Sequence, residues 1–127
     1  MSNKFLVRMN EARAIACEII SEGYTYKEIA EEFGLKLNQV GMLTKLLQEE
    51  DPKLFSQMKI ASKYRDAIKF ANKILRGQIK TEEIVDSSNE KELSRMLKRI
   101  YQYDTRLYIC VKSRISNLIR NANKEET

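Results

Sequence analysis

Residues 26–45, YKEIAEEFGLKLNQVGMLTK, carry the pattern that decides the predicted fold. Ile29, Ala30 and Phe33 recur at helical spacing and form one apolar face. Gly34 follows where this helix would end, because glycine adopts a positive φ without strain. A second apolar face with a new axis then contains Val40, Leu43 and Leu47. Two helices joined by a short glycine turn are typical of a helix-turn-helix, which places its second helix in the DNA major groove.

A local signal marks the beginning of this helix pair. Thr25 and Glu28 are three residues apart, which is the spacing of a capping box. Another helix is predicted before them over residues 9–22, after a frayed stretch at residues 1–7. Its apolar face comprises Ala12, Ile15, Ala16, Ile19 and Ile20. We therefore expect a tri-helical unit in which Phe33 lies inside the core.

The last helix of this unit supplies the candidate DNA contacts. Asn38 and Gln39 stand near its N-terminal end, where side chains reach base edges, and carboxamides can pair bidentately with adenine. Met42 suits contact with a thymine methyl group, while Lys36 and Lys45 supply positive charge for phosphates. Met42 suits a protein surface equally well. A helix-turn-helix kept as a packing or protein-binding unit therefore stays an alternative.

The composition indicates an all-α, non-enzymatic protein. The 127-residue chain is 43% hydrophobic with one proline and four glycines, which favours a folded core of long helices. It has no histidine, no close cysteine pair and no glycine-rich phosphate loop, so we expect no metal, no cofactor and no catalysis. The N-terminal region lacks an apolar segment for export or membrane insertion, which predicts a cytoplasmic protein. Cys17 and Cys110 are expected to be buried thiols.

Positive charge is concentrated in the middle of the chain. Residues 53–80 carry eight basic side chains and one acidic side chain. The preceding 52 residues carry six basic and nine acidic side chains, so the charge follows the predicted helix-turn-helix and does not lie within it. Three parts are predicted: a helix-turn-helix domain at residues 1–50, a long basic helix at residues 51–80, and a C-terminal packing or dimerisation segment at residues 81–127.

The long basic helix is predicted to run without a break from Pro52 to Arg76. Asp51 is placed to cap it, and proline is favoured at the first helical position. Its cations share one face with almost no acidic partner, so a polyanion would relieve their mutual repulsion. That face contains Lys59, Lys63, Lys69, Lys73, Arg76 and Lys80. We expect Lys69, Lys73 and Arg76 to contact the DNA backbone, and a solvated lysine face is the alternative.

The C-terminal segment is predicted to be helical from Glu90 onward, after a connector with one helical turn at residues 82–85. A break at Asp104 would divide it into two helices, and a short strand at residues 107–111 is the minor alternative. Residues 122–127 have the composition of a polar tail.

Residues 90–121 carry an apolar stripe that is wider than the basic helix can cover. Pairing two copies would remove such a stripe from water, so we expect a homodimer through these residues. An intramolecular hairpin that folds back on residues 54–75 would hide the stripe within one chain.

Residues 26–77 resemble the sporulation stage III protein D family of bacterial transcription regulators. The resemblance is carried by EIAEEFGL at residues 28–35, DPKLF at residues 51–55 and ILRG at residues 74–77. That family pairs a helix-turn-helix with a basic C-terminal helix, and both contact DNA. The layout is also similar to small terminase subunits of phages, in which a helix-turn-helix precedes helices that assemble a ring.

The resemblance implies specific roles for some residues. Asn38 and Gln39 would read the major groove, while Lys69, Lys73 and Arg76 would meet phosphates or the adjacent minor groove. We therefore expect a double-stranded DNA-binding protein of bacterial or phage origin that regulates transcription. One alternative is an interaction protein of a mobile element that inhibits a nucleic-acid-handling complex through a protein or RNA contact. Another is a phage DNA-packaging subunit.

Overall fold

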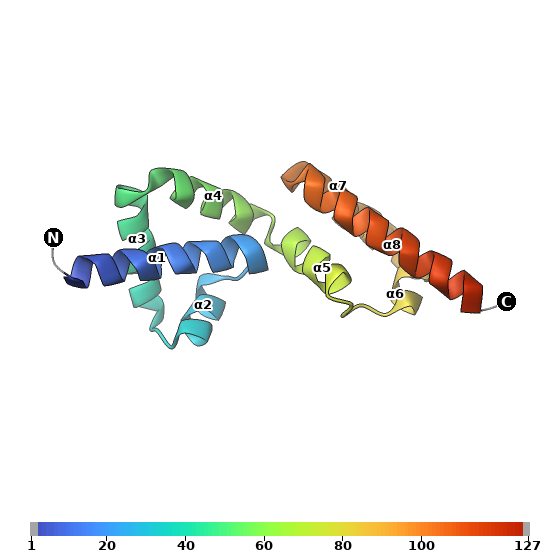
Figure 1. Ribbon diagram of the computed structural model, residues 1–127, viewed down its shortest axis with the longest axis horizontal. Helices are drawn as coiled ribbons and strands as arrows, with labels where there is room; N and C mark the ends of the chain where they lie inside the picture. The colour runs from blue at the N-terminus through green and yellow to red at the C-terminus, as the bar shows by residue number, and fades with distance from the viewer. Residues whose placement is uncertain (1–2, 126–127) are drawn as a thin grey trace. The chain divides into compact units, whose positions relative to one another are not determined.

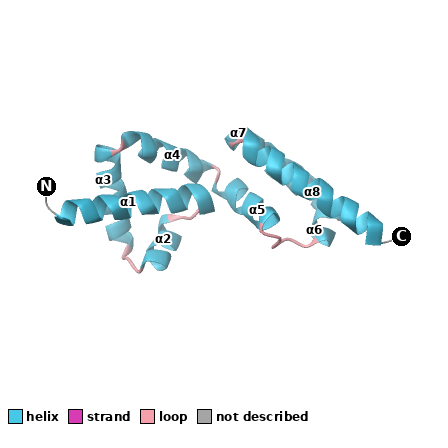
Figure 2. Cartoon of the chain, in the orientation of Figure 1, coloured by secondary structure: helices cyan, strands magenta, loops and turns pink. Residues whose placement is uncertain are grey.

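The structure, a computed structural model, describes the backbone of residues 3–125 and side chains as far as residue 123. Within these residues the chain forms eight α-helices and one short 3-10 helix, and no strand (Figures 1 and 2). The first half contains α1 (Asn3–Glu22), α2 (Tyr26–Phe33), α3 (Leu37–Glu50) and α4 (Pro52–Lys63). The second half contains α5 (Arg65–Leu75), α6 (Thr81–Val85), η1 (Ser87–Asn89), α7 (Glu90–Tyr103) and α8 (Thr105–Glu125). The predicted all-α class is confirmed.

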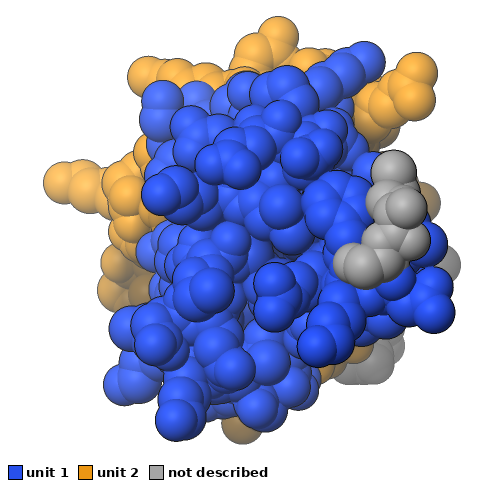
Figure 3. All heavy atoms as spheres, turned by 90° about the vertical axis from the view of Figure 1, so that its left-hand side faces the viewer, with its two compact units in different colours: residues 1–65 blue, residues 66–127 orange. Residues whose placement is uncertain are grey.

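Contacts divide the chain into two compact units, Met1–Arg65 and Asp66–Thr127 (Figure 3). In unit 1, helices α1, α3 and α4 pack on one another, and α2 packs against α3. The buried cluster that joins them contains Ala12, Ile15, Ala16, Ile19, Ile29, Val40, Leu43, Leu47 and Met58. Phe33 is only half-buried at the edge of this cluster, so its predicted full burial is wrong. Phe33 lies in the last turn of α2 and packs against the cluster without being enclosed by it.

Three helix ends in unit 1 are those that the sequence predicts: the start of α2, its end at Gly34 and the start of α4. The Thr25 hydroxyl accepts a hydrogen bond from the Glu28 N–H at 3.1 Å, and the Glu28 carboxylate accepts one from the Thr25 N–H at 3.0 Å. This capping box satisfies two backbone donors that the helix itself leaves unpaired. Gly34 ends α2 with φ 65°, a left-handed conformation that suits glycine. Asp51 caps α4, since its carboxylate accepts a hydrogen bond from the Leu54 N–H at 3.3 Å.

The predicted single helix over residues 52–76 is wrong, because it is interrupted at Tyr64. Tyr64 has φ −110° and ψ 24°, and its N–H donates to the Ala61 carbonyl three residues back. The apolar face changes register there. Met58 and Ala61 are buried in α4, and the buried residues of α5 are Ala67, Ile68, Ala71 and Ile74. Leu75, at the C-terminal end of α5, is 39% exposed.

Asp66 stabilises the start of α5, in whose first turn it lies. Its carboxylate accepts a hydrogen bond from the Ala67 N–H at 2.9 Å, at a helix start where backbone donors need partners. The same oxygen accepts two hydrogen bonds from the Arg99 guanidinium of α7, at 2.9 and 3.1 Å. Partial burial alone would raise the pKa of Asp66, but the hydrogen bonds from Arg99 and Ala67 outweigh it and lower the pKa. An ion pair across unit 2 thus fixes this helix start.

In unit 2, α7 and α8 form a hairpin with its turn at Asp104, so the predicted break is confirmed. The Asp104 carboxylate accepts hydrogen bonds from the Arg106 and Leu107 N–H groups at 3.0 and 3.3 Å, which caps α8. The strand alternative for residues 107–111 is wrong, because these residues lie within α8. The hairpin also buries Met96, Ile100, Val111 and Ile115. The apolar stripe that was predicted to be uncovered is therefore partly buried within one chain. The packing of α7 on α8 buries it, whereas the alternative prediction was a fold-back on residues 54–75.

Further corrections concern the ends of the chain and the cysteines. Helix α1 already begins at Asn3, so the frayed stretch is wrong for residues 3–7, while residues 1–2 lie outside the described part. The polar tail is helical as far as Glu125, and residues 126–127 are again outside the described part. Cys17 and Cys110 are both exposed, because each falls on the outer face of its helix. Between residues 3 and 125, no helix is both long and apolar enough to cross a bilayer.

Candidate functional site

Helix α3 has a buried face and an exposed face. Val40, Leu43, Thr44 and Leu47 are buried against the core of unit 1. Asn38, Met42 and Lys45 lie on the opposite side and are exposed, Met42 at 66%. Three of the predicted contact residues therefore share the solvent-facing side of one helix. Because its buried side is packed against α1 and α4, the exposed side chains stand on a rigid support.

The start of α3 involves two further candidates, Lys36 and Gln39. The Lys36 side chain makes no capping hydrogen bond, but its backbone N–H donates to Gln39 Oε1 at 2.8 Å. Bidentate pairing with adenine requires both the oxygen and the nitrogen of a carboxamide. Gln39 Oε1 already accepts the Lys36 N–H, so it has one lone pair left for a base edge and its carboxamide is held at the start of α3. The exposed Asn38 is therefore the better-placed carboxamide.

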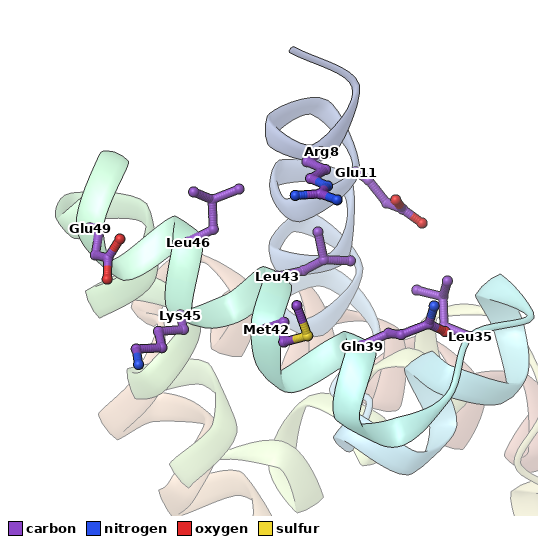
Figure 4. A pocket seen from close by; sticks show the side chains of 9 residues that line it. All are labelled: Arg8, Glu11, Leu35, Gln39, Met42, Leu43, Lys45, Leu46 and Glu49. Atoms are coloured by element: carbon purple, nitrogen blue, oxygen red, sulfur yellow. The ribbon is translucent and has the colours of Figure 1, made fainter. Parts of the chain in front are cut away.

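A groove runs between α1 and α3 beside these residues (Figure 4). It has a volume of ≈ 500 Å³ and an apolar floor of Leu35, Met42, Leu43 and Leu46. Its polar lining comprises Arg8 and Glu11 from α1 and Gln39, Lys45 and Glu49 from α3. No local pattern in the sequence indicates this groove. Arg8 and Glu11 both belong to α1, which begins at Asn3, and Glu11 lies within the helix that the sequence predicts over residues 9–22.

The charge around α2 and α3 is mixed. Residues 26–51 contain three basic and six acidic side chains, a net charge of −3. Glu49 lines the groove near the C-terminal end of α3, whereas Lys36 lies at the other end. Phosphates are attracted to cations and repelled by carboxylates. If a polyanion docks on α3, it therefore favours the N-terminal end, around Lys36 and Asn38.

The remaining predicted backbone contacts lie in the other unit. Lys69 and Lys73 belong to α5, and Arg76 follows its end. Lys73 and Arg76 are exposed, whereas Lys69 is half-buried, so its predicted solvent-facing position is wrong in part. The break at Tyr64 also separates these residues from Lys59 and Lys63. The predicted basic face is thus divided between two units, and does not follow one continuous helix.

Unit 2 has a groove of its own along the α7–α8 hairpin. Its volume is ≈ 510 Å³, and its apolar lining comprises Leu93, Leu97, Tyr101 and Tyr108. The two tyrosine rings meet edge to face with centroids 5.2 Å apart. Tyr101 is 55% exposed, and charged residues Glu90, Lys98 and Lys112 line the same groove. This groove is part of what remains open of the apolar surface at residues 90–121, where Ile109 and Ile119 are also exposed.

Comparisons of the chain with protein-family models, with characterised proteins and with solved structures found no significant match. The family resemblance of residues 26–77 therefore stays a prediction. Functional inference rests on the geometry and charge of the described residues.

Proposed function

We propose that this chain is a non-enzymatic, cytoplasmic protein that binds double-stranded DNA and regulates transcription in a bacterium or phage. The observation that carries the proposal is the exposed side of α3, where Asn38, Met42 and Lys45 project from a helix held on its other side by the core. A short turn through Gly34 joins it to the capped helix α2. This is the order of parts with which a helix-turn-helix presents side chains to the major groove.

Each contact residue then has a definite role. Asn38 pairs with an adenine edge, and Met42 contacts a thymine methyl group. Lys36 and Lys45 bind phosphates on either side and set the register of the helix. Gln39 holds the start of α3 through its bond to the Lys36 N–H and offers its NH₂ group to DNA. Lys69, Lys73 and Arg76 supply additional backbone contacts from unit 2.

The proposal includes a homodimer through residues 90–121. The unit 2 groove supports it, because Leu93, Leu97 and Tyr101 leave apolar surface open beside charges of both signs. The substitution Tyr101→Asp places a charge on this surface without disturbing a buried residue. Light scattering should then change from a dimer mass to a monomer mass. A buried position such as Ile115 cannot test the dimer surface. Ile115 is 5% exposed, so Ile115→Asp would disturb the core of unit 2.

A second candidate function is protein binding through the α1–α3 groove. Its apolar floor and its carboxylates Glu11 and Glu49 suit a protein better than a phosphate backbone. A chain that acts this way would be an interaction protein of a mobile element, inhibiting a nucleic-acid-handling complex. A ring-sized mass in solution would instead favour a phage DNA-packaging subunit.

Titration of a fluorescent random duplex separates these candidates. Under the proposal, the protein binds the duplex at 50 mM salt and the affinity falls steeply as salt increases, because counterions are released. Asn38→Ala should weaken binding to a preferred sequence by about 1–3 kcal/mol. Gln48→Ala is the matched control, since Gln48 is an exposed carboxamide near the other end of α3. Absence of duplex binding at low salt would exclude the DNA-binding function.

A further inference from the structure

Two cations of α7 have acidic partners, whereas the described cations of α8 have none. On α7, Arg95 pairs with Glu92 at 2.7 Å and lies 3.8 Å from Asp66, and Arg99 pairs with Asp66 at 2.9 Å. On α8, no acidic residue occurs between Thr105 and Lys124. The same stretch carries five cations, of which Arg106, Lys112, Arg114 and Arg120 have described, exposed side chains. None of the ion pairs among the described residues involves these four.

Some of these cations lie on one polar face of α8. Arg106, Ser113, Asn117 and Arg120 are spaced by seven, four and three residues, which places them on the same side of the helix. All four are exposed, and they lie opposite the buried Val111 and Ile115. At 1.5 Å per residue, the distance from Arg106 to Arg120 is about 21 Å. Cys110 is also exposed and stands between the arginines on this side.

The chemistry of this face is that of a phosphate-binding surface. Arginine, serine and asparagine side chains are the usual donors to phosphate oxygens, and arginine can donate two hydrogen bonds at once. Each strand of duplex DNA carries a phosphate about every 3.4 Å of helix axis, so a 21 Å face spans several of them. A surface helix that needed only to remain solvated would gain from i,i+4 acidic partners, which α8 lacks.

We infer that the outer face of α8, defined by Arg106, Ser113, Asn117 and Arg120, is a second DNA-binding surface that grips the phosphate backbone of duplex DNA without reading its sequence. The inference rests on the proposed DNA-binding function, but it concerns a different unit from α3. In this arrangement α3 supplies the preference for a sequence, and α8 contributes affinity that is independent of sequence and sensitive to salt.

The first test removes charge from the face in the full-length protein. Arg106→Gln combined with Arg120→Gln should lower the slope of log affinity against log salt by about one unit per charge, and weaken binding roughly fivefold per lost contact near 0.15 M salt. Random and preferred duplexes should lose affinity by the same factor. An unchanged slope and affinity would overturn the inference.

An isosteric pair of substitutions provides the control. Asn117→Asp introduces one negative charge at the centre of the face, and Gln102→Glu introduces the same charge at an exposed position on α7. Only Asn117→Asp should lower DNA affinity several-fold, since a carboxylate repels the phosphate it would face. Equal losses from both substitutions would mean that overall charge matters and the α8 face does not.

The exposed cysteines allow a footprint on the intact complex. Saturating duplex should slow alkylation of Cys110 on the α8 face, while Cys17 on α1 reports general effects of the duplex on thiol reactivity. If duplex binds but Cys110 reacts at an unchanged rate, the α8 inference fails and the proposed function stands. If α3 variants bind normally but the α8 variants do not, the α8 inference stands and the role of α3 fails. Absence of duplex binding overturns both.

Discussion

The two units of this chain are stabilised in different ways. Among the residues that the structure describes, six of the nine largest fully buried side chains belong to unit 1: Ile15, Ile19, Ile29, Val40, Leu47 and Met58. The other three, Ile74, Ile100 and Val111, belong to unit 2. Unit 2 adds the ion pair of Asp66 with Arg99, which joins α5 to α7. Unit 1 also has a long-range ion pair, between Arg13 and Asp51, but its 3.7 Å separation exceeds the 2.9 Å of Asp66 with Arg99. Apolar burial therefore contributes more to unit 1, while the closer charge contact at Asp66 helps to order the smaller core of unit 2.

The largest effect is expected for Leu47→Ala in unit 1. Leu47 is fully buried, so its truncation leaves a cavity and should lower the free energy of unfolding by about 2–5 kcal/mol. Leu46→Ala removes the same atoms from the adjacent, half-buried position in the groove and should cost distinctly less. Urea unfolding followed by circular dichroism measures both. Equal losses would mean that the packed core of unit 1 is misassigned.

An intermediate effect is expected for Thr25→Ala, which removes half of the capping box. The substitution leaves the Glu28 N–H without its side-chain acceptor and should destabilise unit 1 by about 1 kcal/mol. Ser56→Ala, at an exposed position on α4, is a suitable control. If Thr25→Ala unfolds at the same urea concentration as the parent, the cap does not contribute to the stability of unit 1.

The smallest effect is expected for Asp66→Asn, which removes the ion pair with Arg99 in unit 2. Its ion pair is partly exposed, so the loss at neutral pH should be about 0.5–1 kcal/mol. Because the folded-state pKa of Asp66 is lowered, this contribution is present above the unfolded-state pKa and is lost as pH falls through the folded-state pKa. Urea unfolding should therefore distinguish variant from parent at pH 7, and the difference should shrink progressively as pH falls below about 4. A constant difference down to strongly acidic pH would contradict the role of this carboxylate.

The same contrast explains how much of the fold could be predicted from the sequence. In unit 1 the decisive signals act over three or four residues, as with Thr25 and Glu28, or at one residue, as with Gly34. In unit 2 the decisive contact joins Asp66 to Arg99, 33 residues away. The break at Tyr64 has no glycine or proline to mark it. The helical periodicity of the sequence therefore continues through this residue and predicts one unbroken helix.

The candidate site was predictable to a similar extent. Helical spacing alone places Asn38, Met42 and Lys45 on the side of α3 opposite Val40. The bond of Gln39 to the Lys36 N–H has the three-residue spacing of a capping box, but without a Ser, Thr, Asp or Asn cap it was missed. The groove beside α3 depends on where α1 crosses it, which is a tertiary relation that no local pattern encodes.

Selection of bound duplexes from a random pool tests the central claim, that α3 reads DNA bases, most directly. The parent protein should enrich a short motif, and Gln48→Ala should enrich the same motif. Asn38→Ala should relax the preference at one position of that motif, because a bidentate contact is worth about 1–3 kcal/mol of discrimination against the wrong base. A pool that stays random with the parent protein, or a motif that Asn38→Ala leaves unchanged, would contradict base reading by α3.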